Sequence, residues 1–435
     1  MEGSCNRSVW RTTIPAAMAN YIDAGSIVAG SAGLMLWAEY LKMSDWRIGL
    51  IAAFSSNAIS AAVGALIGGW ICDKYGRKIV YTYDMLFYMF GMLFIIFSHS
   101  YVTLFIGYVI VGLSVGADIP ASWTFIAEEA PAEQRAKHCG TAQLAWAIGP
   151  VVTLLLSFAL TDLGLLGSRI VFAHLLVLAF ITWKLRRSLS ESKIWKDEKE
   201  GEKILAEKGV EAKSSFKEFF IIPNLKAMLF LIGIYLFWNM VAGTMGFLMP
   251  FIYQTVGGVT QAQAVILQAF LFTCTALSTY FIFMKYADKM NRRLLYAIAA
   301  IAAIFAWGLF VVAPVTVVIL LIFVIIYGLH CGIGQQAFYQ LWASEIFPTK
   351  YRARSQGIMF FFVRVSCGVW TFLVPHLISA KGFSFVASLM VIFLIISAII
   401  GVIFAPDTSG KTLKQIEHER YEKYKNIHLG LEEIK

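Results

Sequence analysis

Three ionisable side chains lie deep inside long apolar stretches of the sequence, namely Asp23, Asp118 and Arg364. If each stretch is a helix that rises about 1.5 Å per residue, all three lie roughly 14–17 Å from its nearer polar end. That depth is close to the middle of a ~30 Å hydrocarbon layer, where an ionisable group is costly and is therefore a candidate functional group. The two carboxyl groups could bind and release a proton there. Asp23 is the first candidate for this proton-coupling role, and Asp118 is the second. The alternative is that each acid only anchors hydrogen bonds.

Arg364 poses a different chemical question, because a guanidinium stays protonated in a protein and needs an anionic partner. It could pair with one of the two aspartates, or it could receive a carboxylate of a bound molecule with two parallel hydrogen bonds. A third alternative is that its long side chain extends along the membrane face toward water. All three interpretations stay open from the residues alone.

Further polar and aromatic side chains within the apolar stretches are weaker candidates for binding a hydroxylated molecule. Amides and a phenol can hydrogen-bond hydroxyl groups, and an indole can pack on the apolar face of a sugar ring. Each of them is more often helix-packing polarity than a ligand contact. The candidates are Gln143, Trp238, Asn239, Gln336, Tyr339 and Gln340.

The elements that must position these residues follow from the composition of the 435-residue chain. Hydrophobic residues make up 59% of it and charged residues only 14%, against about 45–50% and ~25% in soluble domains. This argues against a soluble enzyme, a nucleic-acid binder and a disordered protein. Twelve apolar stretches have the length of a membrane helix: 12–38, 47–71, 78–99, 101–127, 138–161, 166–187, 227–254, 261–285, 291–313, 315–343, 353–378 and 382–405. The sequence therefore predicts an all-α membrane protein with twelve transmembrane helices.

The twelve stretches fall into two sets of six, with a polar segment between them. We expect a six-helix bundle over 1–187, a linker over 188–226, a second bundle over 227–405 and a tail over 406–435. Apolar clusters at 204–205 and 216–220 predict short amphipathic helices in the linker. Nearly all of the 36 lysines and arginines lie on one side of this arrangement, which predicts that both termini are cytoplasmic and that the protein lies in the plasma (inner) membrane.

The loop between the second and third stretches carries a recognisable motif. It reads Gly69-Trp-Ile-Cys-Asp73-Lys74-Tyr-Gly76-Arg77-Lys78 and resembles the G-x-x-x-D-[RK]-x-G-[RK]-[RK] loop of the major facilitator superfamily. A turn with positive φ suits a glycine at position 76. A degenerate copy begins at Asp288 one half-chain later, with Asn291 in place of the turn glycine, so the same unit is used twice.

Other segments resemble the sugar-porter and metabolite–proton symporter branch of that superfamily. They are Tyr21-Ile-Asp23-Ala-Gly25, the two Glu…Arg elements that end the fourth and tenth stretches, and the segment 406–417. The resemblance implies two six-helix bundles around a central cavity lined by spans one, four, seven and ten. It also implies charged latches that hold the cytoplasmic side closed, formed by Asp73, Arg77, Glu128, Arg135, Asp288, Arg292, Glu345 and Arg352.

The chain departs from the branch at three places. Tyr108 stands where these symporters have an arginine paired with the span-one aspartate, and Phe237-Trp238 stands where sugar porters have a glutamine pair. The P-E-S-P-R segment after span six is reduced to the residues 189–192. These departures argue against simple hexose recognition and against the usual proton-coupling pair.

The sequence thus favours a secondary transporter that imports a sugar, polyol or sugar acid together with protons by alternating access. A facilitator or exporter of an organic acid without proton coupling is the alternative, and a membrane sensor is a third. Phosphate-loop, nucleophile-elbow and metal-ligand patterns are lacking in the sequence, so we expect no enzyme, cofactor, metal or nucleic-acid partner. The expected partners are the small-molecule substrate, protons and the lipid bilayer, and the expected assembly is a monomer.

Overall fold

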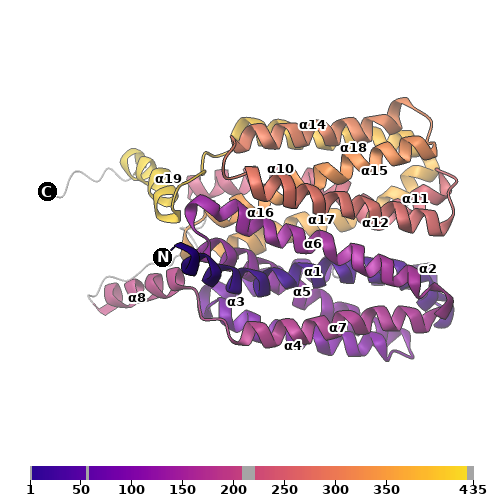
Figure 1. The fold of residues 1–435 in the computed structure, drawn as a ribbon, viewed down its shortest axis with the longest axis horizontal. Coiled ribbons are helices and arrows are strands. Elements are labelled where there is room, and N and C mark those ends of the chain that lie inside the picture. Colours follow the sequence, from indigo (N-terminus) through magenta and orange to yellow (C-terminus); the bar gives the residue numbers. More distant parts are fainter. Residues whose placement is uncertain (1, 55–57, 208–220, 429–435) are drawn as a thin grey trace.

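The computed structural model describes residues 2–54, 58–207 and 221–428. Within that part of the chain the secondary structure is helical throughout, and long helices run side by side along the longest axis (Figure 1). Helices α8 and α19 lie at the end of the molecule where α1 begins (Figure 1). This end is called the linker end below.

The described residues of the first half form seven α-helices. Helix α1 packs along α6 and α7, whereas α4 packs along α5 and α7, and α3 packs on α5. The bounds of these helices are α1 (Glu2–Tyr40), α2 (Asp45–Ala53), α3 (Ile59–Tyr75), α4 (Arg77–Ile96), α5 (Tyr101–Glu129), α6 (Arg135–Ala159) and α7 (Leu165–Arg187).

The second half follows the linker helix α8 (Lys193–Glu207). Helix α10 packs on α17 and α18, α12 packs on α15, and α14 packs on α18. The bounds are α10 (Ile222–Gly243), its π-helical continuation η3 (Thr244–Leu248), α11 (Met249–Thr255), α12 (Gln261–Ser278), α13 (Met284–Tyr286), α14 (Arg292–Val312), α15 (Val317–Ile333), α16 (Gln335–Ile346), α17 (Arg352–Lys381), α18 (Phe383–Phe404) and α19 (Leu413–His428).

The predicted all-α membrane fold with twelve spans is confirmed. Ten helical segments of the described residues are long and apolar enough to cross a membrane, and the first two spans correspond to α1 and to α2 with α3. Span ten is two helices, because α15 ends before Gly334 and α16 starts after it. In the linker, α8 contains the cluster at 204–205, whereas the cluster at 216–220 lies outside the described residues.

Small residues allow the two halves to approach closely where α3 crosses α17. A Cβ atom added to Gly69 would lie 2.5 Å from the carbonyl oxygen of Ala353, and one added to Gly357 would overlap the backbone of Ala65. The turn that follows α3 has Gly76 at φ 105°, a conformation that favours glycine. Backbone contact across the halves therefore brings the motif loop against the start of α17.

Candidate functional site

A small cavity lies between the two halves near the centre of the helices. Its volume is about 30 Å³, which holds about one or two water molecules. Helices α1 and α6 line it from the first half, and α10, α12, α16 and α17 from the second. Its polar and aromatic lining consists of Trp146, Trp238, Asn239, Phe272, Gln336 and Arg364.

An aromatic stack forms one wall of this region. The indole nitrogen of Trp238 donates to Nε2 of His330 at 3.0 Å, and Nδ1 of His330 donates to the carbonyl of Ala299 at 2.8 Å. Tyr235 stacks on Trp238 with ring centroids 5.7 Å apart and on Tyr339 with centroids 3.9 Å apart. The orientation of the Trp238 ring is therefore fixed by a hydrogen bond and by stacking.

Several buried polar atoms in this region have no hydrogen-bond partner among the described residues: Oδ1 of Asn239, the hydroxyl of Tyr339, Oε1 of Gln143 and both amide atoms of Gln340. A buried polar group without a partner costs about 1–3 kcal/mol, so a group of them calls for water or a ligand. Asn239 faces the cavity directly. The other three residues lie outside its lining, and Gln143 donates from Nε2 to the carbonyl of Cys331 at 3.1 Å.

Asp23 and Arg364 are both buried in this central region and come from opposite halves of the chain. The positive charge of Arg364 acts on the carboxylate of Asp23, and Trp146 hydrogen-bonds to the same carboxylate. The guanidinium of Arg364 also lies 4.6 Å above the centre of the Phe360 ring. Tyr108, at the position where the branch has its arginine, packs instead against Phe172. The cation near Asp23 thus comes from span eleven rather than from span four.

Asp118 is in a different environment from Asp23. Its carboxylate accepts a 2.5 Å hydrogen bond from Nη1 of Arg186, at the end of α7. Asp84 of α4 lies 3.4 Å from the same nitrogen. Neither Asp84 nor Arg186 was predicted as a site residue. Asp84 lies inside the stretch 78–99 but only six residues from its start, about 9 Å, and so falls short of the depth of roughly 14–17 Å that identified Asp23.

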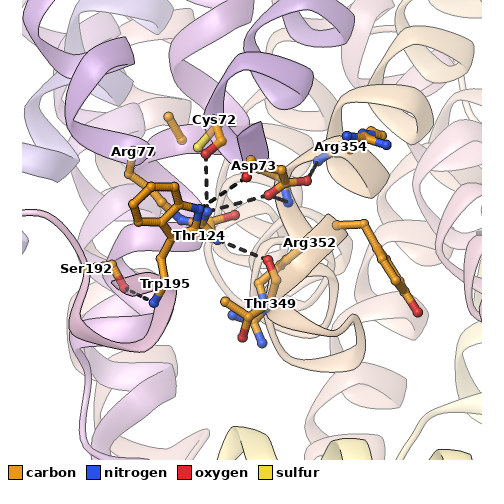
Figure 2. Close-up of polar contacts among 12 residues, drawn as sticks. Cys72, Asp73, Arg77, Thr124, Ser192, Trp195, Thr349, Arg352 and Arg354 are labelled. Carbon is orange, nitrogen blue, oxygen red and sulfur yellow. Dashed lines mark hydrogen bonds and ion pairs between the residues drawn. The ribbon is translucent and has the colours of Figure 1, made fainter. Parts of the chain in front are cut away.

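At the linker end, the predicted latch residues form two ion-pair networks. In the first, Glu128 of α5 accepts from Arg77 at 2.8 Å and from Arg352 of the other half at 2.7 Å. Arg77 also lies 3.6 Å from Asp73 and donates to the carbonyl of Thr349 at 3.3 Å (Figure 2). All four charged side chains are buried. The network therefore connects the motif loop of the first half to the start of α17.

The second network repeats this pattern with the halves exchanged. Glu345 of α16 accepts from Arg292 at 2.9 Å and from Arg135 of the first half at 3.2 Å. Arg292 also pairs with Asp288 at 3.1 Å, and Arg135 donates to the carbonyl of Lys411 at 2.9 Å. Each glutamate thus holds one arginine from its own half and one from the other half.

Each motif aspartate also accepts two backbone amides at a helix start in the opposite half. Asp73 accepts from Ala353 and Arg354 of α17 at 3.2 and 2.7 Å (Figure 2). Asp288 accepts from Ala136 and Lys137 of α6 at 3.0 and 2.9 Å. Burial raises the pKa of Asp73 to about 6, although Arg77 and the two amides favour its charged form, and burial also raises the pKa of Asp288. Carboxylates at helix N-termini are favourably placed, so both contacts hold the halves together.

The linker covers the first network, a contact that sequence reasoning missed. Glu191 accepts from the backbone amides of Arg77 and Lys78 at 3.0 and 2.9 Å, and the indole of Trp195 donates to the carbonyl of Asp73 at 3.2 Å (Figure 2 shows Trp195). The only signal for it in the sequence was the reduced segment 189–192. The linker end is therefore closed by both networks together with Glu191 and Trp195, just before and at the start of α8.

Comparisons with known proteins agree with this architecture. The family profile described as Major Facilitator Superfamily matches residues 13–371. The chain belongs to the major facilitator superfamily. It is therefore a multi-pass membrane transporter and not an enzyme.

The chain is also similar to individual transporters and to solved transporter structures. The chain is 55% identical to the minor myo-inositol transporter IolF of Bacillus subtilis (strain 168), with 94% of each chain covered. It is 24% identical to the cis,cis-muconate transport protein of Acinetobacter baylyi, with 79% of this chain and 81% of that one covered. The structure of the proton:xylose symporter XylE matches with a TM-score of 0.81 at 18% identity, over 94% of this chain and 98% of that one.

Proposed function

We propose that this protein imports a small neutral polyol of the inositol class together with protons, by alternating access. The observation that carries this proposal is the 55% identity to a myo-inositol transporter over 94% of both chains. The lining of the central cavity is compatible with such a substrate, since it combines indole rings with amides and a guanidinium. Hydroxyl groups accept and donate hydrogen bonds, and the C–H face of a six-membered ring packs on an aromatic surface.

Substrate binding requires the cavity to enlarge, because its 30 Å³ are far below the roughly 300 Å³ of a ligand pocket. In this proposal Asn239, Gln336 and Arg364 bind substrate hydroxyls and Trp238 packs against the ring. The unpartnered groups of Gln143, Tyr339 and Gln340 complete the site as the halves separate.

The two halves, 1–187 and 227–405, would move as units during the cycle. The excess of basic residues at the linker end supports a cytoplasmic orientation of that end, with both termini in the cytoplasm and the protein in the cell membrane. The two ion-pair networks then seal the cytoplasmic side, and both must break before substrate leaves. Their eight charged residues act as the cytoplasmic latch.

Proton coupling would act through Asp23 and Arg364. When Asp23 is charged, it attracts a guanidinium that belongs to the other half and to the substrate cavity. A proton on Asp23 removes this attraction and leaves Arg364 available to substrate hydroxyls. Protonation and substrate binding thus favour each other, which is the requirement for symport.

The test uses purified protein in liposomes and radiolabelled myo-inositol. An inward proton gradient should drive accumulation, and a protonophore should abolish it. The variant Asp23→Asn should lose accumulation by at least about tenfold while exchange of labelled for unlabelled substrate continues. The exposed Asp162→Asn is the matched control and should behave as wild type. Accumulation by Asp23→Asn at the wild-type level contradicts the coupling role, and absence of any myo-inositol flux contradicts the substrate class.

A second candidate substrate is a carboxylated metabolite, for the specific reason that Arg364 lines the cavity. Competition separates the two candidates. For a neutral polyol, unlabelled inositol should inhibit uptake and a sugar acid should not, and Arg364→Gln should weaken polyol transport about tenfold. If the sugar acid competes more strongly than inositol and this competition disappears in Arg364→Gln, the substrate is an anion.

A further inference from the structure

A second buried acidic cluster lies in the first half, outside the substrate cavity. Asp84 of α4 and Asp118 of α5 face Arg186 of α7, and all three are at most 5% exposed. Arg186 also donates to the carbonyls of Pro15 and Ala16 in α1, at 2.8 and 2.6 Å. Four helices of the first half therefore meet at this one guanidinium.

The charges of this cluster do not balance if both acids are ionised. One guanidinium faces two carboxyl groups, because Nη1 of Arg186 lies 2.5 Å from Asp118 and 3.4 Å from Asp84. Two buried carboxylates beside one guanidinium leave one negative charge without a cation, and a proton shared by the two acids removes that charge. Tyr81 lies against Arg186 but donates its hydroxyl proton to the carbonyl of Ala121 at 3.1 Å. The pair itself is therefore the place for the proton.

A small cavity connects this cluster with Asp23. It has a volume of about 10 Å³, enough for about one water molecule. Asp23 and Asp118 both line it, together with Asn20 and Met85. Among the described residues, Nδ2 of Asn20 and Oδ1 of Asp23 have no hydrogen-bond partner, so the cavity wall carries a donor and an acceptor suited to water.

We propose that Asp84 and Asp118 form a second proton-binding site, which exchanges a proton with Asp23 through the cavity between them. The proton leaves the carboxyl group of Asp23, passes to the water, and the water gives a proton to the pair, so one proton moves in total. Arg186 holds the pair and at the same time binds the backbone of α1, the helix that carries Asp23. The use of this site in transport rests on the function proposed above.

The position of the pair explains what the site would contribute. Asp84 is seven residues, or about 10 Å, from the start of α4 at the linker end. After Asp23 loses its proton and attracts Arg364, the proton is held within the first half on the side toward the linker end. Release of the proton and release of the substrate can then be separate steps.

The direct test is infrared difference spectroscopy of the protein in lipid as the pH is raised. Wild type should show the carboxylic-acid C=O band of the pair in addition to that of Asp23. The isosteric variant Asp84→Asn should lose the band of the pair and keep that of Asp23, and Asp162→Asn should keep both. Survival of both bands in Asp84→Asn, or a wild-type spectrum with only the band that Asp23→Asn removes, overturns the proposal.

Transport assays give a second test. Loss of a merely structural contact would reduce proton-driven accumulation and substrate exchange together, whereas loss of a proton-binding site reduces accumulation alone. Asp84→Asn should reduce proton-driven accumulation about tenfold while substrate exchange stays within about twofold of wild type. Equal loss of both activities in a protein that melts like wild type, or no loss of accumulation, overturns the exchange with Asp23. If wild type itself shows no proton-driven uptake, the proposed symport fails, whereas the infrared result still decides whether the pair holds a proton.

Discussion

The buried charges at the linker end and the buried polar groups around the central cavity are arranged in opposite ways. At the linker end, Glu128 and Glu345 each hold two arginines, and both motif aspartates accept two backbone amides. Around the cavity, Asn239 and Gln340 keep unpartnered polar atoms among the described residues. Satisfied charges that bridge the two halves stabilise one conformation, whereas unsatisfied groups in a small cavity are suited to a ligand that comes and goes.

The largest effect should follow from breaking the shared carboxylate of the first network. Glu128→Gln leaves Arg77 and Arg352 buried around a neutral amide, which should cost the sealed state about 3–5 kcal/mol. Alkylation of the buried thiol of Cys72 beside the network, applied from the linker end, should become at least about a hundredfold faster. The neighbouring half-buried Glu129→Gln serves as the control. Equal alkylation rates for the two variants contradict the proposed latch.

The next effect concerns the aromatic wall of the cavity. Trp238→Ala removes the surface proposed to pack on the substrate ring, a loss of about 2 kcal/mol that corresponds to a roughly thirtyfold higher KM. Trp238→Phe keeps a ring but not the hydrogen bond to His330, so its KM should rise less. The exposed Trp46→Ala is the control. A KM of Trp238→Ala equal to that of the control removes this residue from the site.

A third prediction uses the pKa of Asp73, which burial raises to about 6 in the sealed state from its ordinary 3.8. If opening hydrates Asp73 and restores the ordinary pKa, the sealed state binds the proton more tightly. Its additional stability is fully present below pH 3.8 and is lost as the pH rises through about 6.

Acidifying the linker side from about pH 7 to about pH 5 should therefore stabilise the sealed state through protonation of Asp73. As a result, the rate of substrate efflux should fall about tenfold. Asp73→Asn cannot titrate and should lose that part of the pH dependence. An identical efflux profile in wild type and Asp73→Asn shows that Asp73 does not carry the effect.

The smallest effect is expected for an exposed ion pair. Lys411 lies 2.9 Å from Glu419 and 3.6 Å from Asp407, but these pairs are open to solvent. Such pairs contribute about 0–1 kcal/mol, so Lys411→Ala should shift the melting temperature of the protein hardly at all. A destabilisation comparable with that of Glu128→Gln would show that burial is not what distinguishes the Glu128 network from the exposed pairs of Lys411.

The sequence by itself determined the twelve spans, because the hydrophobic length of a membrane helix is a local property of consecutive residues. It also identified Asp73, Arg77 and Glu128 as latch residues, because the ten-residue motif and the Glu…Arg elements resemble segments of the superfamily. The depth of Asp23, Asp118 and Arg364 could be counted from the same stretches. None of this required knowing which helix faces which.

The tertiary structure alone decided the partners of those buried charges. Asp118 and Arg186 are 68 positions apart, and whether they meet depends on the rotation of α5 and α7 about their axes, which hydropathy does not encode. The same holds for Arg364, which reaches the region of Asp23 from the other half of the chain. A buried charge is identified by its local sequence, but its role depends on the neighbours that packing places around it, because electrostatic interactions weaken with distance in space and not along the chain.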